Sequence, residues 1–396
     1  MSENVKKFPT ATMSVQMGPS HPSMHGIVKL NLELDGETIL RVEPEIGYLH
    51  RGFEKMCEVR TWNQVLPFTD RLNYVSAGLN NVGYHLAVEK LIGLEIPERA
   101  KYIRVIFSEL FRIIDHFICV AAAAMELGGF TVYFYCVEAR EKLFELTEGL
   151  SGARITTSYG RIGGVNRDLF PGFAEHYRAV KKRCMELYKD IDTLLTKNRI
   201  FIDRVRNTGV ISKEDAINFS YAGPMLRSTG FAHDLRKVEP YLVYDRFDFE
   251  VPVGDNGDNF DRYSVRMREI LQSFRIIDQA LEQIPDGPII SDDVRYVLPP
   301  KNEVYHSIEG MMNHFKLIME GVKVPAGEIY SATEAANGEL GFFIVSDGGG
   351  KPYRIHVRAP CFHFTASLPF LLEGGLLADI IPTFDAINMI GGELER

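Results

Sequence analysis

The chain has 396 residues and carries 44 Lys and Arg against 53 Asp and Glu, a formal net charge of −9. Because affinity for nucleic-acid phosphates depends on clustered basic side chains, this acidic chain without a basic tract is a poor candidate for a nucleic-acid binder. Its 45% hydrophobic and 24% charged residues exclude wholesale disorder, and the length allows two or three domains.

Neither a membrane-spanning segment nor a secretory signal is expected. The longest apolar run, Phe117–Met125, is far shorter than the about 20 residues that cross a bilayer. The start of the chain, Met1–Lys7, has no apolar stretch behind its lysines. We therefore expect a protein that is soluble by itself and that can still dock on a membrane partner.

The cysteines are isolated from one another. The sequence holds five of them and no C-x-x-C pair, so we expect reduced thiols and neither a disulfide framework nor a cysteine-bound zinc or iron–sulfur site. They are Cys57, Cys119, Cys136, Cys184 and Cys361.

Residues 1–61 predict a small antiparallel sheet. Ile27–Leu34 alternates between apolar and polar residues, Asp35-Gly36 supplies a two-residue turn, and Thr38–Val42 returns. An Asp-Gly pair between alternating runs is the strongest short hairpin signal. We expect an N-terminal β-sheet region that also carries a histidine-bearing loop.

Residues 62–285 predict a bundle of long helices. One helix begins after Pro97, and its apolar residues recur every three or four positions. Asp115 and Glu126 lie on the opposite stripe of this helix, separated by small residues. Further helical segments are expected over Asn63–Leu94, Thr131–Leu150, Phe173–Asn198 and Asn259–Gln283.

Residues 286–396 predict a mixed α/β region with a second hairpin, formed by Gly341–Ser346 and Tyr353–Arg358 around a glycine-rich turn. Long helices without strands between most of them argue against a doubly wound sheet. The sequence therefore predicts an α+β fold, in which a central helical bundle has antiparallel β elements at both ends.

Two histidines share one rigid loop. His21 and His25 lie four residues apart, but Pro19, Pro22 and Gly26 exclude the helix on which this spacing would suit a metal ion. The favoured interpretation is a loop whose imidazoles bind nearby backbone, and a metal site is the weaker alternative.

No cofactor motif accompanies this loop. Gly160–Gly164 lacks the G-x-G-x-x-G spacing, and the sequence has no Walker loop, G-x-S-x-G or H-E-x-x-H. Arg51 and Arg71 are typical of surface salt bridges, and Tyr74, on an expected helix, is typical of an amphipathic core residue. The residues alone indicate a soluble, helical α+β protein without a cofactor motif of its own.

A series of motifs extends over nearly the whole chain. In chain order the motifs are Gly18–Gly26 (GPSHPSMHG), Ile46–Lys55 (IGYLHRGFEK), Tyr159–Val165 (YGRIGGV), Val345–Gly349 (VSDGG) and Tyr353–Pro360 (YRIHVRAP). In this order they resemble the motifs of the 49-kDa-type, or D-type, subunit of respiratory complex I, the proton-pumping NADH:quinone oxidoreductase. The resemblance implies a peripheral-arm protein that is active only within the assembled enzyme.

This family resembles the large subunit of nickel–iron hydrogenases, which implies a hydrogenase-like fold. Hydrogenases hold their metals with R-x-C-x-x-C near the start of the chain and D-P-C-x-x-C near its end. Here Asn73 and Ser76 stand at the first pair of cysteine positions, and the segment Asp385–Ile390 has no cysteine either. Because nickel and iron need soft thiolate ligands, we expect no metal ligands in this chain and no hydrogenase activity.

The resemblance implies a quinone cavity between this chain and an iron–sulfur partner subunit. The family's histidine and tyrosine at the quinone head group match His25 and Tyr74. A tyrosine hydroxyl can donate to a quinone carbonyl, and an imidazolium can supply a proton during reduction. Family members commonly pair this histidine with an aspartate, and the corresponding residue here is Glu126, which keeps the charge on a side chain one methylene longer and would keep His25 protonated and oriented. The alternative for Glu126 is a local cap or pair.

Two arginines match family residues near the partner's terminal iron–sulfur cluster. Positive charge at Arg51 and Arg71 would raise the potential of that cluster. Many family members carry His-His where this chain has Thr156-Thr157, and the first of these histidines is linked to a pH-dependent cluster potential. Its absence favours the hypothesis of a low-potential quinone such as menaquinone.

The resemblance assigns no bound cofactor to this chain. The substrate is a quinone, ubiquinone or menaquinone, whereas NADH, FMN and the clusters belong to other subunits. The implied partners are the iron–sulfur subunit, other peripheral-arm subunits and the membrane arm, on the cytoplasmic side of the bacterial membrane. Two alternatives stay open: the equivalent protein of a ferredoxin- or F420-driven complex that reduces quinone or phenazine, and a scaffold without a working site. His25 together with Tyr74 favours a working site.

Overall fold

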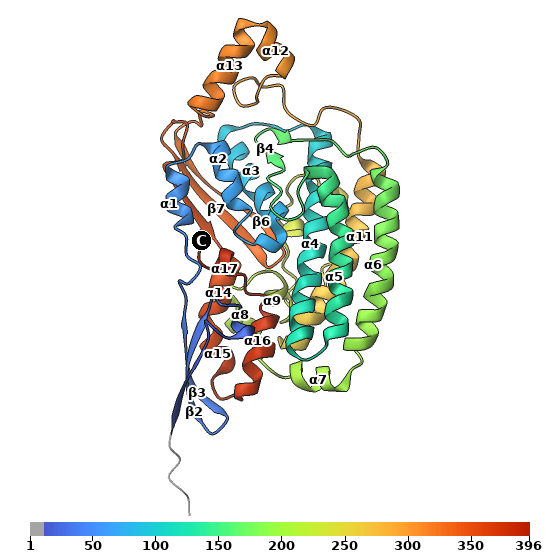
Figure 1. The fold of residues 1–396 in the computed structure, drawn as a ribbon, viewed down its shortest axis with the longest axis vertical. Helices are drawn as coiled ribbons and strands as arrows, with labels where there is room; N and C mark the ends of the chain where they lie inside the picture. Colours follow the sequence, from blue (N-terminus) through green and yellow to red (C-terminus); the bar gives the residue numbers. More distant parts are fainter. Residues whose placement is uncertain (1–11) are drawn as a thin grey trace, which may run out of the picture.

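The computed structural model describes residues 12–396, and its N-terminal part is the predicted antiparallel sheet (Figure 1). The predicted turn Asp35-Gly36 joins the second and third strands, and Gly36 has a positive φ of 60°. The segment Met1–Lys7, in which no secretory signal is expected, lies outside the described residues. The strands are β1 (Met13–Met17), β2 (Lys29–Asp35) and β3 (Thr38–Glu45).

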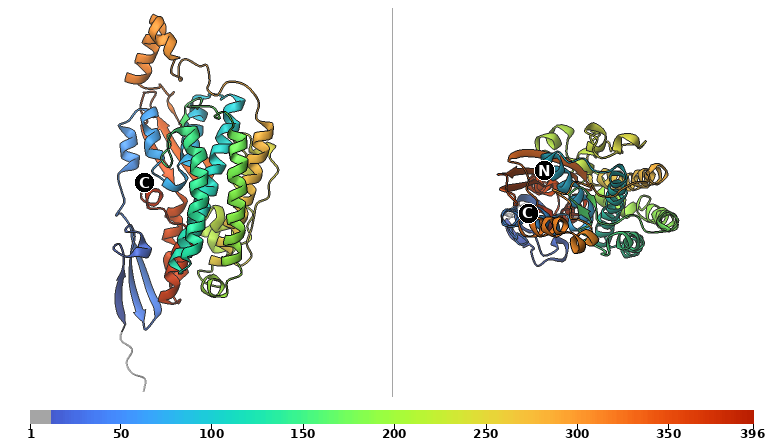
Figure 2. Two further views of the ribbon diagram at one scale, coloured as in Figure 1. Left: turned by 45° about the vertical axis from the view of Figure 1, so that its right-hand side comes forward. Right: turned by 90° about the horizontal axis from the view of Figure 1, so that it is seen from above.

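Long helices stand side by side in the bundle that the apolar periodicity predicts (Figures 1 and 2). Their facing sides bury a continuous hydrophobic core, to which the first of them contributes Ile103, Ile106 and Leu110. Removal of this apolar area from water is the main force that holds the bundle together. The helices are α4 (Glu98–Glu126), α5 (Phe130–Ser151), α6 (Phe173–Leu195) and α11 (Asn259–Gln283).

The segment Asn63–Leu94, expected as one helical stretch, is interrupted. The cause is Asn73, whose side-chain Oδ1 accepts hydrogen bonds from the N–H groups two and three residues further on, at 3.1 and 3.3 Å. Such local bonds compete with a continuous helix. Tyr74 therefore lies in a turn and not in the middle of a helix. The elements are α2 (Trp62–Thr69), the 3-10 turn η2 (Tyr74–Ser76) and α3 (Ala77–Ile92).

The C-terminal region holds a three-stranded antiparallel sheet, of which the sequence predicts one hairpin. That hairpin is present as β7 and β8. The additional strand, β6, pairs with β7 over its whole length. The last three residues of β6 are all buried, without alternation, which explains why the period-2 pattern does not reveal the strand. The strands are β6 (Gly327–Ala335), β7 (Gly338–Ser346) and β8 (Arg354–Arg358).

Short helices and a two-stranded sheet, β4–β5, complete the fold. One helical hairpin, α12–α13, projects from the body, and the last helices lie beside the N-terminal sheet (Figure 1). The remaining elements are η1 (Pro22–Met24), α1 (Phe53–Glu58), β4 (Gly160–Arg161), β5 (Gly164–Val165), α7 (Arg199–Val205), α8 (Lys213–Asn218), α9 (Gly223–Arg227), α10 (Leu235–Val238), η3 (Tyr244–Arg246), α12 (Lys301–His306), α13 (Ile308–Met319), α14 (Pro360–Ala366), α15 (Leu368–Leu372), η4 (Leu377–Asp379), α16 (Ile380–Ala386) and α17 (Gly391–Leu394).

The two ends of the chain share one core. Leu30 and Leu32 of β2 pack in the same buried cluster as Phe364, Leu368 and Ile380 of the C-terminal helices. The sequence predicts three regions, 1–61, 62–285 and 286–396, and this core contains residues of the first and the last. It also brings the loop between β1 and β2 against α16 and the end of α4.

Candidate functional site: a cavity between the histidine loop and the C-terminal helices

The histidine-bearing loop is held by its own backbone. It forms the 3-10 turn η1, in which His21 Nδ1 accepts a hydrogen bond from the N–H of Ser23 at 3.2 Å. His21 thus binds backbone, as the favoured sequence interpretation predicts. Met24 is fully buried, and His25 follows it with a positive φ of 54°. Within residues 12–396, no group of three or more His, Cys, Asp and Glu side chains is placed to hold a metal ion.

His25 lies beside a buried carboxylate. Its Nε2 is 3.9 Å from Oδ1 of Asp385, which is 1% exposed, and its ring stacks on Phe384 with centroids 6.3 Å apart. The neighbouring carboxylate of Asp385 raises the pKa of His25 against the lowering effect of burial, and Glu126 adds a weaker electrostatic effect. The raised pKa of His25 favours an imidazolium. Burial raises the pKa of Asp385, and the neighbouring His25 opposes this effect.

Glu126 contacts the same loop at a different residue. Its Oε2 accepts a hydrogen bond from the hydroxyl of Ser23 at 2.6 Å. Its effect on the pKa of His25 is electrostatic and weaker than that of Asp385. The direct carboxylate neighbour of His25 is thus Asp385, which the sequence argument considered only as part of the segment without cysteine. Asp385 is far from the histidine loop in sequence. The two lie close together only because both ends of the chain pack into one core.

Tyr74 and His25 line one cavity of about 170 Å³. Tyr74 is 37% exposed, and burial is the main cause that raises the pKa of its hydroxyl. The cavity lies between η1, η2, α4 and α16. Its other lining residues are Ile27, Val75, Ile118, Ala122, Phe384, Asp385, Asn388, Met389 and Ile390.

Amide groups and one carboxylate form a buried hydrogen-bonded bridge that includes Asn388 of the cavity lining. Asp115 accepts a hydrogen bond from the side-chain amide of Asn73 at 2.8 Å and another from that of Asn388 at 2.7 Å. Asn388 also donates to the side-chain carbonyl of Asn337 at 2.7 Å. All four residues are buried. This bridge fixes the turn that carries Tyr74 to α4 and to the end of α16.

Arg51 and Arg71 line a different cavity, of about 460 Å³, together with apolar side chains. Arg51 Nη2 donates to the carbonyl oxygen of Arg71 at 3.0 Å, and Arg71 donates to the carbonyl oxygen of Pro67. Among residues 12–396, neither guanidinium forms an ion pair. The surface salt bridges that are typical of arginine are therefore not formed here.

Thr156 and Thr157 lie beside the turn that follows α2. Thr157 is buried, and its hydroxyl oxygen has no hydrogen-bond partner within residues 12–396. The next residue, Ser158, donates to the carboxylate of Asp70 from both its N–H and its hydroxyl. This segment is thus tied to the residue that immediately precedes Arg71.

Fold and cavity define an α+β protein in which a histidine, a tyrosine and buried carboxylates from distant segments meet beside a helical bundle. Residues 126–396 match the family of the 49 kDa subunit of respiratory-chain NADH dehydrogenase, and the chain belongs to this family of complex I proteins. The resemblance found in the sequence is thereby confirmed.

Individual relatives cover nearly the whole chain. The D subunit of NADH-quinone oxidoreductase from Myxococcus xanthus is 59% identical over 98% of this chain and 93% of its own length. One D-type subunit of the same enzyme from Anaeromyxobacter dehalogenans is 58% identical over 98% of this chain and 90% of its own length. The C/D subunit of NADH-quinone oxidoreductase from Bdellovibrio bacteriovorus is 50% identical over 97% of this chain and 69% of its own length.

Within residues 12–396, every helix is too short or too polar to span a lipid bilayer.

Proposed function

We propose that this chain forms, together with an iron–sulfur partner subunit, the cavity in which NADH-quinone oxidoreductase reduces quinone. The observation that carries the proposal is the shared cavity of His25 and Tyr74, with Asp385 buried beside the imidazole. The relatives are named as D subunits of NADH-quinone oxidoreductase, which supports the reaction.

The cavity residues fit the needs of quinone reduction. A quinone takes up two electrons and two protons, and its carbonyl oxygens accept hydrogen bonds. In this proposal Tyr74 donates its hydroxyl hydrogen bond to a carbonyl oxygen, and the His25 imidazolium donates a proton. Asp385 stabilises the imidazolium, while Glu126 holds the loop through Ser23 and adds negative charge. Electrons arrive one at a time from the partner's terminal cluster.

Arg51 and Arg71 would face that partner. Two guanidiniums that form no ion pair among residues 12–396 leave positive charge available to a redox group outside this chain, and positive charge raises a cluster's potential. Thr156 stands where the family has the histidine that is linked to a pH-dependent cluster potential, so we propose a cluster potential that varies little with pH and a low-potential quinone such as menaquinone. A redox titration with a slope near one proton per electron would contradict this account.

The assembly proposed here follows from the family. The C/D relative supports the C component of the enzyme as a neighbour, and the iron–sulfur subunit, the remaining peripheral arm and the membrane arm complete the set. NADH, FMN and clusters belong to other subunits, and the chain would lie peripherally on the cytoplasmic side of the membrane. We further propose a fold related to nickel–iron hydrogenase large subunits, in which the Asn73–Asp115–Asn388 bridge occupies the former metal region.

The test is Tyr74→Phe in membranes that contain the assembled complex. The change removes one hydroxyl and little volume, so assembly should persist. We expect the rate with a short-tailed quinone to fall at least tenfold, while NADH oxidation by ferricyanide, which bypasses the quinone, stays unchanged. Tyr353→Phe is the matched control, because this tyrosine is 66% exposed and lies outside the cavity. An unchanged quinone rate would assign Tyr74 to packing and remove the basis of the proposed site.

A further inference from the structure

Glu395, near the C-terminal end of the chain, forms hydrogen bonds with the loop that precedes Arg51. Glu395 is 5% exposed, and it follows the short helix α17. Its carboxylate accepts two backbone hydrogen bonds, one from the N–H of Gly47 to Oε1 and one from the N–H of Leu49 to Oε2, both at 2.6 Å. The carbonyl oxygen of Glu395 lies 2.7 Å from Nδ1 of His50. One residue thus binds three residues of the loop that ends directly before Arg51.

Helix α17, which precedes Glu395, also contacts Arg51 and the segment Arg71–Leu72. Gly392 accepts a hydrogen bond from Arg51 Nη2 at 3.4 Å. A Cβ atom at Gly392 would lie 2.4 Å from the carbonyl oxygen of Arg71 and 2.6 Å from that of Leu72. The backbone of α17 therefore fits closely between the two segments, and only a glycine permits this approach.

Backbone contacts decide where these guanidiniums lie. Arginine has a long side chain with several rotatable bonds, and a partner carboxylate usually limits its freedom. Among residues 12–396, Arg51 has only carbonyl oxygens as acceptors, from Arg71 and Gly392. The position of the Arg51 guanidinium in the cavity lining therefore depends on the backbone of the loop before Arg51 and on the backbone of α17, which Glu395 follows.

We propose that Glu395 is a positioning residue for Arg51. It fixes the loop Gly47–Arg51 by its paired backbone hydrogen bonds and thereby sets the positive potential that this chain presents to the partner's nearest iron–sulfur cluster. The inference rests on the proposed function, in which Arg51 acts on that cluster.

The sign of the effect separates positioning from a direct electrostatic role. Glu395 itself carries a negative charge, and removal of a nearby negative charge would raise the midpoint potential of the cluster. If Glu395 acts through Arg51, its loss lets the guanidinium move away, and the midpoint potential falls. The two roles therefore predict shifts in opposite directions for the same substitution.

The experiment is a redox titration of the partner's nearest cluster, followed by its electron paramagnetic resonance signal in the isolated complex. Glu395→Gln keeps the side-chain length but replaces one acceptor oxygen by an N–H₂ group, which cannot accept the second backbone bond. We expect its midpoint potential to fall by at least half of the shift caused by Arg51→Met. In the Arg51→Met background, Glu395→Gln should add less than a third of its own effect, because coupled residues are not additive.

A second variant tests the loop without a change of charge, and a control tests the loss of a carboxylate elsewhere. Gly47→Ala disturbs the same loop at a positive φ of 123°, where a Cβ would meet no atom within 4 Å, and leaves the carboxylate charge in place. We expect a shift in the same direction as for Glu395→Gln. Glu373→Gln is the matched control, since the Glu373 carboxylate likewise accepts a backbone hydrogen bond, at 3.1 Å from the N–H of Val42 on β3. It should leave the potential unchanged.

The outcomes distinguish this inference from the proposed function. If Arg51→Met leaves the cluster potential unchanged, the role proposed for the arginine is wrong and the positioning role falls with it. If Arg51→Met shifts the potential and Glu395→Gln does not, only the positioning role is wrong. A rise of the potential in Glu395→Gln would overturn it as well and assign the effect to the carboxylate charge itself.

Discussion

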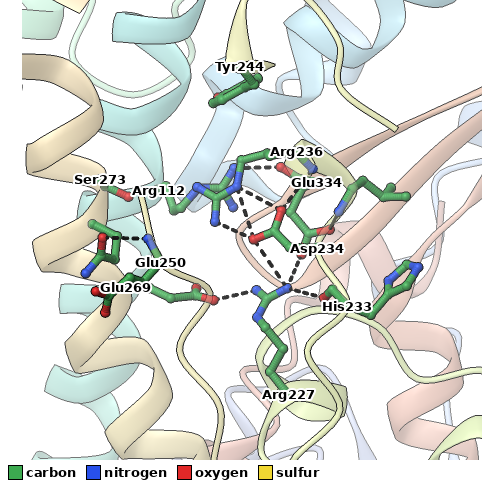
Figure 3. A network of polar contacts seen from close by, with 12 residues as sticks. Arg112, Arg227, His233, Asp234, Arg236, Tyr244, Glu250, Glu269, Ser273 and Glu334 are labelled. Atoms are coloured by element: carbon green, nitrogen blue, oxygen red, sulfur yellow. Dashed lines mark hydrogen bonds and ion pairs between the residues drawn. The ribbon is translucent and has the colours of Figure 1, made fainter. Parts of the chain in front are cut away.

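Two polar regions of this molecule differ in how completely their charges are paired. The first lies between α4, α9, α10, α11 and β6, where carboxylates and guanidiniums with at most 1% exposure form a closed network (Figure 3). Each carboxylate of this network contacts at least two N–H or O–H donors. Its charged members are Glu109, Arg112, Arg227, Asp234, Arg236, Glu269 and Glu334.

The second region is the pair of cavities, where the charges are paired incompletely. His25 is 3.9 Å from Asp385, whereas each carboxylate of the first region lies within 3.2 Å of a guanidinium nitrogen. Among the described residues, the hydrogen-bond acceptors of Arg51 and Arg71 are all backbone carbonyl oxygens. Buried charges are costly unless they are paired, so the first region uses its charges to fix the fold. The second keeps hydrogen-bonding capacity for a ligand and for a partner subunit.

The largest effect is expected from Arg227→Met in the closed network. Arg227 lies 2.8 Å from Glu334, 2.5 Å from Glu269 and 3.7 Å from Asp234. Its removal leaves three buried carboxylates with excess negative charge, and breaking such a network destabilises a protein by about 3–5 kcal/mol. Denaturant unfolding of the purified chain should show a loss of this size. Arg295→Met, at an exposed ion pair with Asp293, should leave the midpoint unchanged.

An unfolding midpoint of Arg227→Met equal to that of the unmodified chain would mean that the buried arginine is replaced without penalty. The network would then be a source of specificity and not of stability. A large loss confined to Arg227→Met would confirm the contrast between the two regions.

A smaller effect, on protonation, is expected from Asp385→Asn in the cavity. Asp385 is the main cause that raises the pKa of His25, so its neutralisation should lower that pKa. His25 would then lose its proton at a lower pH, and the alkaline limb of the pH profile of quinone reduction should move to lower pH. The histidine signals in an NMR titration of the isotope-labelled chain provide a direct measurement. A pKa of His25 that does not change would contradict the electrostatic pairing.

The sequence predicts the fold far better than it predicts the contacts of the cavity. The α4 periodicity and the Asp35-Gly36 turn are local signals, and both elements form where they are expected. The break before Tyr74 also has a local cause, the capping side chain of Asn73, but the pattern over Asn63–Leu94 is helical on both sides and conceals it.

The contact between His25 and Asp385 could not be predicted from such local signals. The two residues come from opposite ends of the chain, and no periodicity within either segment relates them. Their approach depends on the core that β2 shares with α14–α16. The resemblance to a family indicated His25 and Tyr74 as site residues, whereas the carboxylate at 3.9 Å required the three-dimensional arrangement.

The smallest effect concerns the role of Glu126, and it separates two ways in which this residue can serve His25. Ser23→Ala removes the hydroxyl that donates to Glu126 at 2.6 Å, and we expect up to about a fivefold loss of kcat/KM for quinone, or about 1 kcal/mol, because the histidine loop is held less firmly. Glu126→Gln keeps an acceptor oxygen for Ser23 and removes the charge. If Glu126 anchors the loop, Glu126→Gln stays close to the unmodified enzyme and Glu126→Ala resembles Ser23→Ala. If its charge matters more, Glu126→Gln moves the pH profile in the same direction as Asp385→Asn, since each carboxylate raises the pKa of His25.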